Sequence, residues 1–341
     1  MAHQSLYRSY RPKTFKEVVG QEHVTDPLQD QIKAGKVAHA YLFAGSRGLG
    51  KTSIARIFAR ELGTTEKDLY EIDAASNNGV DDIRSLSENI YTHPFESPYK
   101  VYILDEVHMF SKGAWNAFLK TLEEPPPYAI FILATTELEK VPDTVQSRCQ
   151  VFSMRKPTRA GLSGMIASVA KKEGYTIEPS AADLISLLAD GSYRDGLSVL
   201  ERVFASSPDK KITRAEAERA TGAPKLELVY ALVSALSGGE SSAALSTIRK
   251  AEDESVDMTL YLSLVLEYLR TVLLVRFAPD LRKDIALDLG EDEYARVLAL
   301  AENKESKISH DTLKRFLDAA SRIRYSPVPA LPLELAVLES V

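Results

Sequence analysis

Cysteine is nearly absent from this sequence, in which Cys149 is the only one among 341 residues. One thiol excludes an intrachain disulfide framework and any zinc site made of several cysteines. Long apolar runs are absent too, because the richest one, Tyr261 to Phe277, is interrupted by Glu267 and Arg270, so we expect no membrane-spanning helix. The first residues, MAHQSLYRSY, lack the apolar core of a signal peptide. Together these absences predict a cytoplasmic protein that no membrane anchors.

An excess of positive charge is also absent. Lys and Arg number 42 against 48 Asp and Glu, a net charge of −6, and most of the acidic excess lies beyond residue 222. Without an overall basic surface, the chain would contact nucleic acid only through local groups, as one member of an assembly. The 45% hydrophobic and 26% charged residues are ordinary for a folded protein. A length of 341 residues corresponds to two or three domains.

Short apolar segments alternate with amphipathic ones in the first part of the chain. Four apolar segments predict strands: residues 40–44, 69–73, 101–105 and 130–136. Stretches with helical spacing, such as Trp115, Phe118 and Leu122, separate them, and this alternation predicts a parallel sheet with helices on both faces. The remainder has helical patterns and no convincing strand. We therefore expect one α/β domain and two all-α domains, with these boundaries: residues 1–158, 159–222 and 223–341.

The most specific motif is GSRGLGKT, Gly45 to Thr52, which matches the phosphate-loop pattern G-x-x-x-x-G-K-[ST] in full. Its glycines let consecutive backbone N–H groups point at phosphate oxygens, and the following helix N-terminus adds partial positive charge. Lys51 would reach the β- and γ-phosphates, and the Thr52 hydroxyl would hold Mg²⁺. The alternative is a chance glycine loop, which the preceding apolar run and the following amphipathic segment disfavour.

A carboxylate pair forms the second motif. Asp105 and Glu106 follow the apolar run VYIL directly, which places them at the end of a buried strand. Asp105 would orient Mg²⁺ through water, and Glu106 would polarise the attacking water. A solvated turn is the alternative. Beside a lysine and a metal ion, the pair favours hydrolysis of a nucleoside triphosphate.

Three further positions offer weaker evidence. Thr136, at the end of the fourth predicted strand, would bridge the γ-phosphate and the attacking water, although threonine is common in strands. Arg148, in the tripeptide SRC, is a candidate arginine finger, with a surface salt bridge as the alternative. Arg194, in GSYRDGL, would reach back to the γ-phosphate, and an ion pair on the helix surface, with Asp195 or a neighbour, is its alternative.

Six longer segments resemble the AAA+ ATPases and, among them, the gamma/tau family of bacterial DNA polymerase III subunits: YRPKTFKEVVGQEHV, HAYLFAGSRGLGKTSIARIFA, EIDAASNNGVDDIR, YILDEVHMFSKGAWNAFLKTLEEPP, FILATTELEKVPDTVQSRCQVF and ADGSYRDGLSVLE. The resemblance is close over about residues 5 to 205 and looser beyond. It implies an AAA+ nucleotide domain, then a helical lid, then a helical collar for oligomerisation. It also implies an ATPase that uses ATP and Mg²⁺ to load the sliding clamp onto primed DNA, within a pentameric loader of the polymerase III holoenzyme.

The resemblance assigns roles to residues of the nucleotide site. Its adenine pocket corresponds to five residues of the N-terminal segment: Tyr7, Arg11, Pro12, Val18 and Val19. Its phosphate-binding residues correspond to one continuous segment: Gly45, Ser46, Arg47, Gly48, Leu49, Gly50, Lys51, Thr52 and Ser53. Thr136 corresponds to the sensor threonine, and Arg194 and Leu197 to the lid residues at the nucleotide. In this family Arg148 would act in trans, on ATP bound by the adjacent subunit.

The resemblance also implies two protein surfaces. The helix after Asn77 and Asn78 would face DNA, with its N-terminal amides and Arg84 near phosphates. Helix N-termini can follow a phosphate backbone without a basic protein overall, and such contacts carry little sequence information. The segment that holds Tyr91 and Phe95 would touch the sliding clamp, and packing of these two side chains against the sheet is an equal alternative.

The chain departs from the family in one respect. Family members usually carry a four-cysteine zinc module between the first helix and second strand, whereas here ARELGTTEKDLYEID runs straight through. We therefore expect no structural zinc. We also expect no tau-type extension after residue 341, and so no contact with polymerase or helicase through one. Two other functions stay open: a non-hydrolysing structural subunit of the same loader, and another AAA+ DNA motor such as a branch-migration helicase, which would add a C-terminal winged-helix domain.

Overall fold

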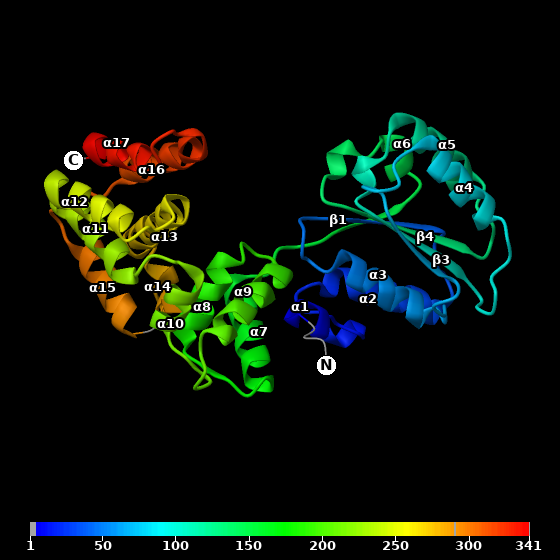
Figure 1. The fold of residues 1–341 in the computed structure, drawn as a ribbon, viewed down its shortest axis with the longest axis horizontal. Coiled ribbons are helices and arrows are strands. Elements are labelled where there is room, and N and C mark those ends of the chain that lie inside the picture. The colour runs from blue at the N-terminus through cyan, green and yellow to red at the C-terminus, as the bar shows by residue number, and fades with distance from the viewer. Residues whose placement is uncertain (1–4, 290, 341) are drawn as a thin grey trace. The chain divides into compact units, whose positions relative to one another are not determined.

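The computed structural model describes residues 5–289 and 291–340, and the chain divides into two compact units (Figure 1). The first unit comprises Met1–Val169 and Ser186–Glu201, and the second comprises Ala170–Ile185 and Arg202–Val341. Three helices contribute residues to both units: α7 (Arg159–Lys172), α8 (Pro179–Leu188) and α9 (Tyr193–Ala205). The three domains expected from the sequence stay a prediction.

The first unit is built on a five-stranded sheet whose neighbouring strands are all parallel, in the order β2-β3-β4-β1-β5. Its strands are β1 (Ala40–Ala44), β2 (Leu69–Asp73), β3 (Lys100–Asp105), β4 (Ala129–Thr135) and β5 (Gln150–Ser153). The three central strands are almost entirely buried, because helices cover both faces and such strands need apolar residues throughout. The expected α/β class is confirmed. The edge strand β5 was not expected, since its four residues are mostly exposed and too few to show a pattern.

Alternate residues of each central strand face opposite sides of the sheet. On one side, Leu42 and Phe131 pack with Trp115 and Phe118, and on the other Tyr41 packs with residues of the phosphate-loop helix. Figure 1 shows α2 and α3 on one face, and α4 and α5 on the other. The helices of this part are α1 (Leu6–Ser9), α2 (Glu22–Ala34), α3 (Lys51–Glu61), α4 (Val80–Ile90), α5 (Lys112–Glu123) and α6 (Asp143–Gln146).

The parallel strands bring the candidate residues to one edge of the sheet. Ala44 pairs with Thr135, and Leu104 with Leu133, so β1, β3 and β4 end side by side. The chain turns sharply after β1 at Gly45, whose φ is +149°. A Cβ on Gly45 would lie 2.8 Å from the Cβ of Met154, so only glycine fits at this turn.

The second unit is helical apart from one small strand pair. Its helices are α10 (Arg214–Thr221), α11 (Leu226–Gly238), α12 (Ser241–Asp253), α13 (Met258–Phe277), α14 (Arg282–Leu289), α15 (Glu291–Glu302), α16 (His310–Arg322) and α17 (Leu331–Ser340). The pair consists of β6 (Thr176–Ile177) and β7 (Lys211–Ile212), which run parallel. The prediction of no strand between residues 159 and 222 was therefore wrong, because strands of two residues leave no periodic pattern.

Helix α13 is the central helix of the second unit. It packs against α11, α15 and α16, and Tyr261, Val265, Leu269 and Val272 are all fully buried. Within the described residues, α13 is the helix that is long and apolar enough to cross a membrane, with 20 residues and a mean hydropathy of 1.6. We interpret it as a core helix, since 56% of its most apolar stretch is buried within the chain.

Replacing Phe118 with alanine tests the core of the first unit. Phe118 is 0% exposed and its ring lies 5.4 Å from that of Phe131, so Phe118→Ala is expected to lower the free energy of unfolding by about 3–5 kcal/mol. Urea titration followed by fluorescence of Trp115, the single tryptophan, measures the change. Phe95→Ala, at a side chain 75% exposed, is the control and should cost less than about 1 kcal/mol. Equal losses in both variants would contradict the packing described.

Candidate functional site

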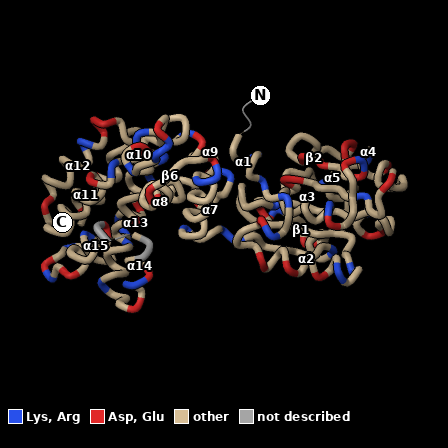
Figure 2. Tube along the Cα trace, turned by 90° about the horizontal axis from the view of Figure 1, so that it is seen from below, with Lys and Arg blue, Asp and Glu red and all other residues tan. Residues whose placement is uncertain are grey.

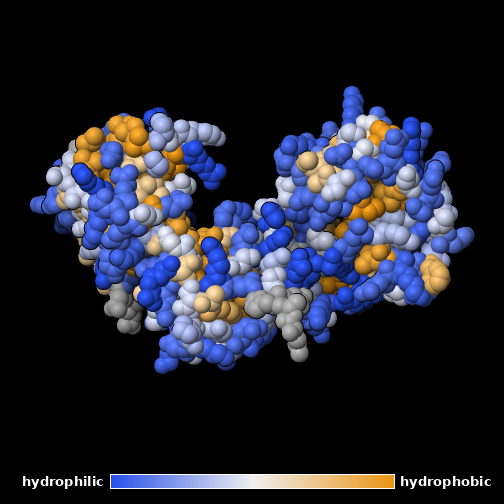
Figure 3. Space-filling model, viewed as in Figure 1, coloured by the Kyte–Doolittle hydropathy of each residue, from blue (hydrophilic) through white to orange (hydrophobic). Residues whose placement is uncertain are grey.

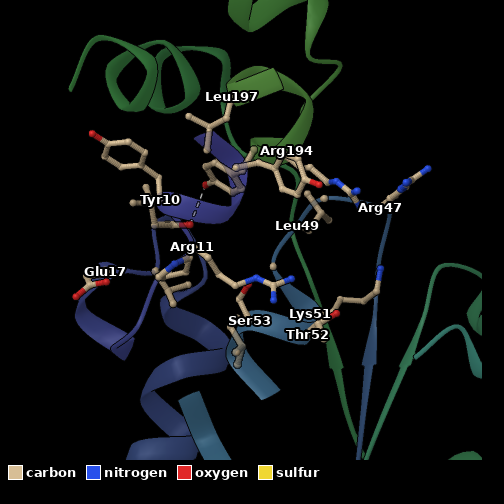
Figure 4. Close-up of a pocket in the computed structure, with 18 of the residues that line it drawn as sticks. Tyr10, Arg11, Glu17, Arg47, Leu49, Lys51, Thr52, Ser53, Arg194 and Leu197 are labelled. Atoms are coloured by element: carbon tan, nitrogen blue, oxygen red, sulfur yellow. Dashed lines mark hydrogen bonds between the residues drawn. The ribbon is translucent and has the colours of Figure 1, made fainter. Parts of the chain in front are cut away.

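A pocket in the first unit opens where β1 and β3 end, between the phosphate loop and the first turns of α9 (Figure 4). Its lining residues come from the N-terminal segment, the phosphate loop, the end of β3, and helices α7 and α9: Tyr7, Tyr10, Arg11, Pro12, Glu17, Val18, Val19, residues 47–54, Asp105, Glu106, Met165, Tyr193, Arg194 and Leu197. Figure 4 shows Arg194 and Leu197 on one wall, and Lys51, Thr52 and Ser53 on the opposite one.

The phosphate loop surrounds the ammonium group of Lys51. Gly48 and Gly50 have φ values of +80° and +94°, which glycine adopts without strain, and α3 begins at Lys51. The Nζ atom of Lys51 donates to the carbonyl oxygens of Gly45 (2.6 Å) and Ser46 (3.1 Å). Gly45 and Ser46 are thus held at the lysine and are not among the lining residues. Burial lowers the pKa of Lys51, and the neighbouring carboxylates of Glu106 and Asp105 oppose this effect.

The two carboxylates predicted from the sequence lie beside the loop. The Thr52 hydroxyl donates to Oδ2 of Asp105 at 2.7 Å, which brings two oxygen atoms of the kind that Mg²⁺ prefers into contact. Glu106 has a left-handed backbone, with φ +52°, and the Thr136 hydroxyl donates to its Oε2 atom at 3.1 Å. Four of the predicted residues, Thr52, Asp105, Glu106 and Thr136, therefore form two adjoining pairs.

Sequence reasoning missed His108, which adjoins this group. Its side chain is 8% exposed, its Nδ1 atom lies 3.2 Å from the Thr135 hydroxyl and 3.5 Å from Oε2 of Glu106, and its Nε2 atom lies 3.2 Å from Oε1 of Glu137. Its position two residues after Glu106, in DEVH, was the available indication.

The N-terminal segment forms one end of the pocket, where the adenine is expected. All five residues predicted there line the pocket, and five lining residues were not predicted: Tyr10, Glu17, Ile54, Met165 and Tyr193. Burial lowers the pKa of Arg11, and the nearby Arg56 guanidinium acts in the same direction. Met165 lies on α7, far from any motif, so nothing in the sequence indicated its place in the pocket.

The guanidinium carbon of Arg194 lies 4.7 Å from the centroid of the Tyr7 ring, within the range of a cation–π contact. Within the described residues no ion pair joins Arg194 to Asp195, the alternative considered from the sequence. Arg194 therefore lies at the wall of the pocket, beside residues of the N-terminal segment.

Arg148 lies away from the pocket. Its Nη2 atom is 2.7 Å from Oε1 of Glu123, and its Nη1 atom donates to the Thr144 carbonyl at 2.7 Å. The surface ion pair considered as the alternative is thus present in this chain. Burial raises the pKa of the neighbouring Cys149 thiol to about 12.

The residues expected at DNA lie at the start of α4, also outside the pocket. The Asn77 amide donates to the Asp73 carbonyl at 3.0 Å, and Asn78 accepts a bond from the backbone of Ser111. Arg84 lies on the exposed side of α4, where it forms an ion pair with Asp81 at 3.3 Å.

The segment that carries Tyr91 and Phe95 is exposed but firmly held. Tyr91 is 55% and Phe95 75% exposed, so the alternative of packing against the sheet is wrong. The buried carboxylate of Asp68 accepts bonds from the backbone N–H groups of Phe95 (2.6 Å), Glu96 (3.0 Å) and Ser97 (2.8 Å). Burial alone would raise the pKa of Asp68, but these bonds outweigh it and lower that pKa to about 2.

Among residues 5–289 and 291–340, no group of three or more His, Cys, Asp or Glu side chains is arranged to hold a metal ion. The expectation of no structural zinc stays a prediction. Thr52 and Asp105 offer a pair of oxygen atoms suited to a magnesium ion that a bound phosphate would help to hold.

Comparison with known proteins gives the family. A family model described as DNA polymerase III, delta subunit, matches residues 20–78 and 64–158, and one described as DNA polymerase III subunits gamma and tau domain III matches residues 212–341. The DNA polymerase III subunit tau of Bacillus subtilis is 37% identical over 99% of this chain, which covers 63% of that protein. The subunit gamma of Buchnera aphidicola is 32% identical over 100% of this chain and 99% of its own length.

A solved structure shares the fold. The RuvB Holliday junction branch migration motor of Thermotoga maritima aligns with a TM-score of 0.55 and 20% identity, over 89% of this chain and 97% of that one. At this identity the likeness concerns the fold alone. The sequence relatives cover the whole chain at higher identity, including the helical last third where the resemblance was looser. The chain therefore has an AAA+ fold and belongs to the gamma/tau family of bacterial DNA polymerase III subunits.

Proposed function

We propose that this chain is the ATP-hydrolysing subunit of a bacterial clamp loader, which uses ATP binding and hydrolysis to load the sliding clamp onto primed DNA. Because the chain spans 63% of the length of its Bacillus relative, the activity of the whole protein is inferred from the family and from the site. One observation carries the proposal: the phosphate-loop hydroxyl of Thr52 lies in hydrogen-bond contact with Asp105, beside Lys51 and Glu106.

The chain's own residues suit the hydrolysis of a phosphoanhydride. Backbone N–H groups at the start of α3 and the Lys51 ammonium would bind the β- and γ-phosphates, and Lys51 would leave the carbonyl oxygens of Gly45 and Ser46 to do so. A bound Mg²⁺, held by Thr52 and through water by Asp105, would offset charge on the phosphates. Glu106 would accept a proton from the attacking water.

Thr136 would position the catalytic carboxylate. Its hydroxyl donates to Glu106 at 3.1 Å, which fixes the direction of that side chain. The same hydroxyl would bridge the γ-phosphate and the attacking water. Tyr7, Arg11, Pro12, Val18 and Val19 would surround the adenine.

Arg148 would complete the site of a neighbouring subunit. It lies outside its own pocket, and its ion pair with Glu123 is only partly shielded, with side chains 35% and 52% exposed. An exposed ion pair contributes little free energy, so the guanidinium can exchange Glu123 for a phosphate at low cost. Arg148 would therefore lie on the surface, where a neighbouring subunit's nucleotide can reach it.

The DNA contact would be local and independent of base sequence. Figure 2 shows basic and acidic residues interspersed along the chain, without a continuous basic stripe. The N-terminus of α4, with Asn77, Asn78 and Arg84, would therefore approach the phosphate backbone. Tyr91 and Phe95 would touch the sliding clamp, since exposed aromatic side chains on a rigid backbone make strong contacts.

The other loader subunits would bind the helical last part, the predicted collar over residues 223–341, whereas residues 159–222 would form the lid. Figure 3 shows hydrophobic residues gathered over the region of α16 and α17. The exposed apolar side chains there belong to these two helices and the turn between them: Leu317, Tyr325, Val328, Leu331, Leu335 and Leu338. A surface of this kind favours burial against a partner chain. We place the assembly in the cytoplasm, without zinc.

Neither alternative function has a specific observation in its favour. A non-hydrolysing subunit would not need Lys51, Thr52, Asp105 and Glu106 in one pocket. A branch-migration motor is favoured only by the shared fold, and the described residues beyond 222 form helices, with no strand for a winged-helix domain.

Replacing Lys51 tests nucleotide binding. Lys51→Ala removes the charge that would face the phosphates, and ATP affinity is expected to fall about 100-fold, because a bond between charged groups contributes roughly 1.5–3 kcal/mol. Calorimetric titration of the purified chain with ATP and Mg²⁺ measures the affinity. Lys36→Ala, at an exposed lysine after α2, is the control. An unchanged affinity in Lys51→Ala would refute the phosphate-loop role.

Substitutions at Arg148 and at Glu123 distinguish an arginine finger from a simple salt bridge. With companion subunits, clamp and primed DNA supplied, Arg148→Ala is expected to bind ATP normally but to hydrolyse it about 10³-fold more slowly. Glu123→Ala removes the same ion pair and leaves the arginine, so its hydrolysis rate should stay near the original. An equal decrease in the hydrolysis rate of both variants would show that only the salt bridge matters.

Replacing Asp68 tests how the Phe95 segment is held. The pKa of Asp68 lies below its ordinary value of 3.8, so its contribution to stability is present above pH 4 and is lost as the pH falls toward 2. Asp68→Asn should lower the free energy of unfolding by about 1–3 kcal/mol at pH 7 and should weaken clamp binding. Urea titrations from pH 7 to 3 measure the difference, which should shrink below pH 4.

The control for that substitution is Asp81→Asn, at a side chain 94% exposed, which should change stability little at any pH. A difference for Asp68→Asn that is the same at pH 7 and pH 3 would contradict the charged interaction described.

A further inference from the structure

The first turn of α9 is bonded to the wall of the pocket at one point and lies close to the phosphate loop at another. The Tyr193 hydroxyl donates to the Val19 carbonyl at 2.8 Å, and a Cβ on Gly20 would lie 3.2 Å from that hydroxyl. On the other side, a Cβ on Gly48 would lie 2.0 Å from the Ser192 hydroxyl oxygen. The backbone at the start of α9 thus lies close to the phosphate loop at Gly48, whose φ of +80° also favours glycine.

This anchoring determines how Arg194 can act. Its Cβ lies 3.3 Å from the position that a Cβ on Gly48 would take, so the backbone of Arg194 is already at the phosphate loop. The side chain nevertheless lies over the Tyr7 ring, with the guanidinium carbon 4.7 Å from the ring centroid. A change of rotamer, without movement of the helix, would carry the charge from the ring to a phosphate.

The two positions of the guanidinium compete in energy. A cation over an exposed or half-exposed aromatic ring gains roughly 0.5–1 kcal/mol, whereas hydrogen bonds to a phosphate are charge-assisted and considerably stronger. A diphosphate ends before the γ-position, where Arg194 is proposed to act, so Tyr7 would keep Arg194 when ADP is bound and lose it when ATP is bound. The affinity for ATP is therefore reduced by the energy of the contact between Arg194 and the Tyr7 ring, which is lost when ATP binds.

We propose that Tyr7 is a specificity-determining residue of this site, which holds Arg194 in the absence of a γ-phosphate and thereby moderates the preference for triphosphate over diphosphate. The inference rests on the proposed nucleotide function. Tyr7 acts on this preference through Arg194 and not through the base, because the adenine is the same in both nucleotides.

The test compares affinities for ATPγS, a slowly hydrolysed triphosphate, and for ADP, both with Mg²⁺, by calorimetry on the full chain. Tyr7→Leu removes the ring but keeps an apolar side chain, and the ratio of triphosphate to diphosphate affinity is expected to rise about 2–5-fold. Tyr7→Phe keeps the ring and should keep the ratio near its original value, even where both affinities shift. Taking a ratio cancels losses that Tyr7→Leu causes at the base end.

A second pair of variants shows whether the effect passes through the arginine. In Arg194→Ala, which lacks the guanidinium, adding Tyr7→Leu should leave the ratio unchanged. A ratio that does not rise in Tyr7→Leu, or that rises equally in the Arg194→Ala background, would overturn the inference while the nucleotide function stands. If the original chain binds neither nucleotide, the proposed function fails and this inference fails with it.

Discussion

The contact between Thr52 and Asp105 depends on the parallel sheet more than on either residue. Thr52 belongs to the first turn of α3 and Asp105 ends β3, 53 positions further along the chain. They meet because β4 lies between β1 and β3 in the sheet and all three strands point the same way. Parallel strands require buried crossover helices, so the site's geometry is fixed by the packing of α3, α4 and α5 on the two faces.

Local patterns in the sequence were sufficient for four of the five strands and for the phosphate loop. Residues 40–44 and 101–104 are continuous apolar runs within their strands. The glycine motif requires its own conformation wherever a strand precedes it and a helix follows. For that reason the predicted fold class and the grouping of Lys51, Asp105 and Glu106 agree with the structure.

What the sequence could not supply depends on contacts between distant segments. Strand β5 is an edge strand defined by its pairing with β1, and its own residues are mostly exposed. The place of Tyr193 follows from its bond to the Val19 carbonyl, 174 positions away. Asp68 resembles any charged residue before a strand, yet its carboxylate holds three backbone N–H groups of a distant segment. Such roles become visible only when the chain is folded.

The balance of charge around the pocket joins these observations. Arg11, Arg47, Lys51 and Arg194 line it together with Glu17, Asp105 and Glu106, and burial lowers the pKa of both Lys51 and Arg11. A buried cation is costly unless an anion accompanies it. The carboxylates of Asp105 and Glu106 partly offset the charge of Lys51, which also donates to two carbonyl oxygens, and the exposed guanidinium of Arg194 lies over an aromatic ring. The contacts with the carbonyl oxygens and with the ring are weaker than charge-assisted bonds to a phosphate. A polyphosphate would replace each of them with a stronger bond, so the energy of binding would be available to move both side chains.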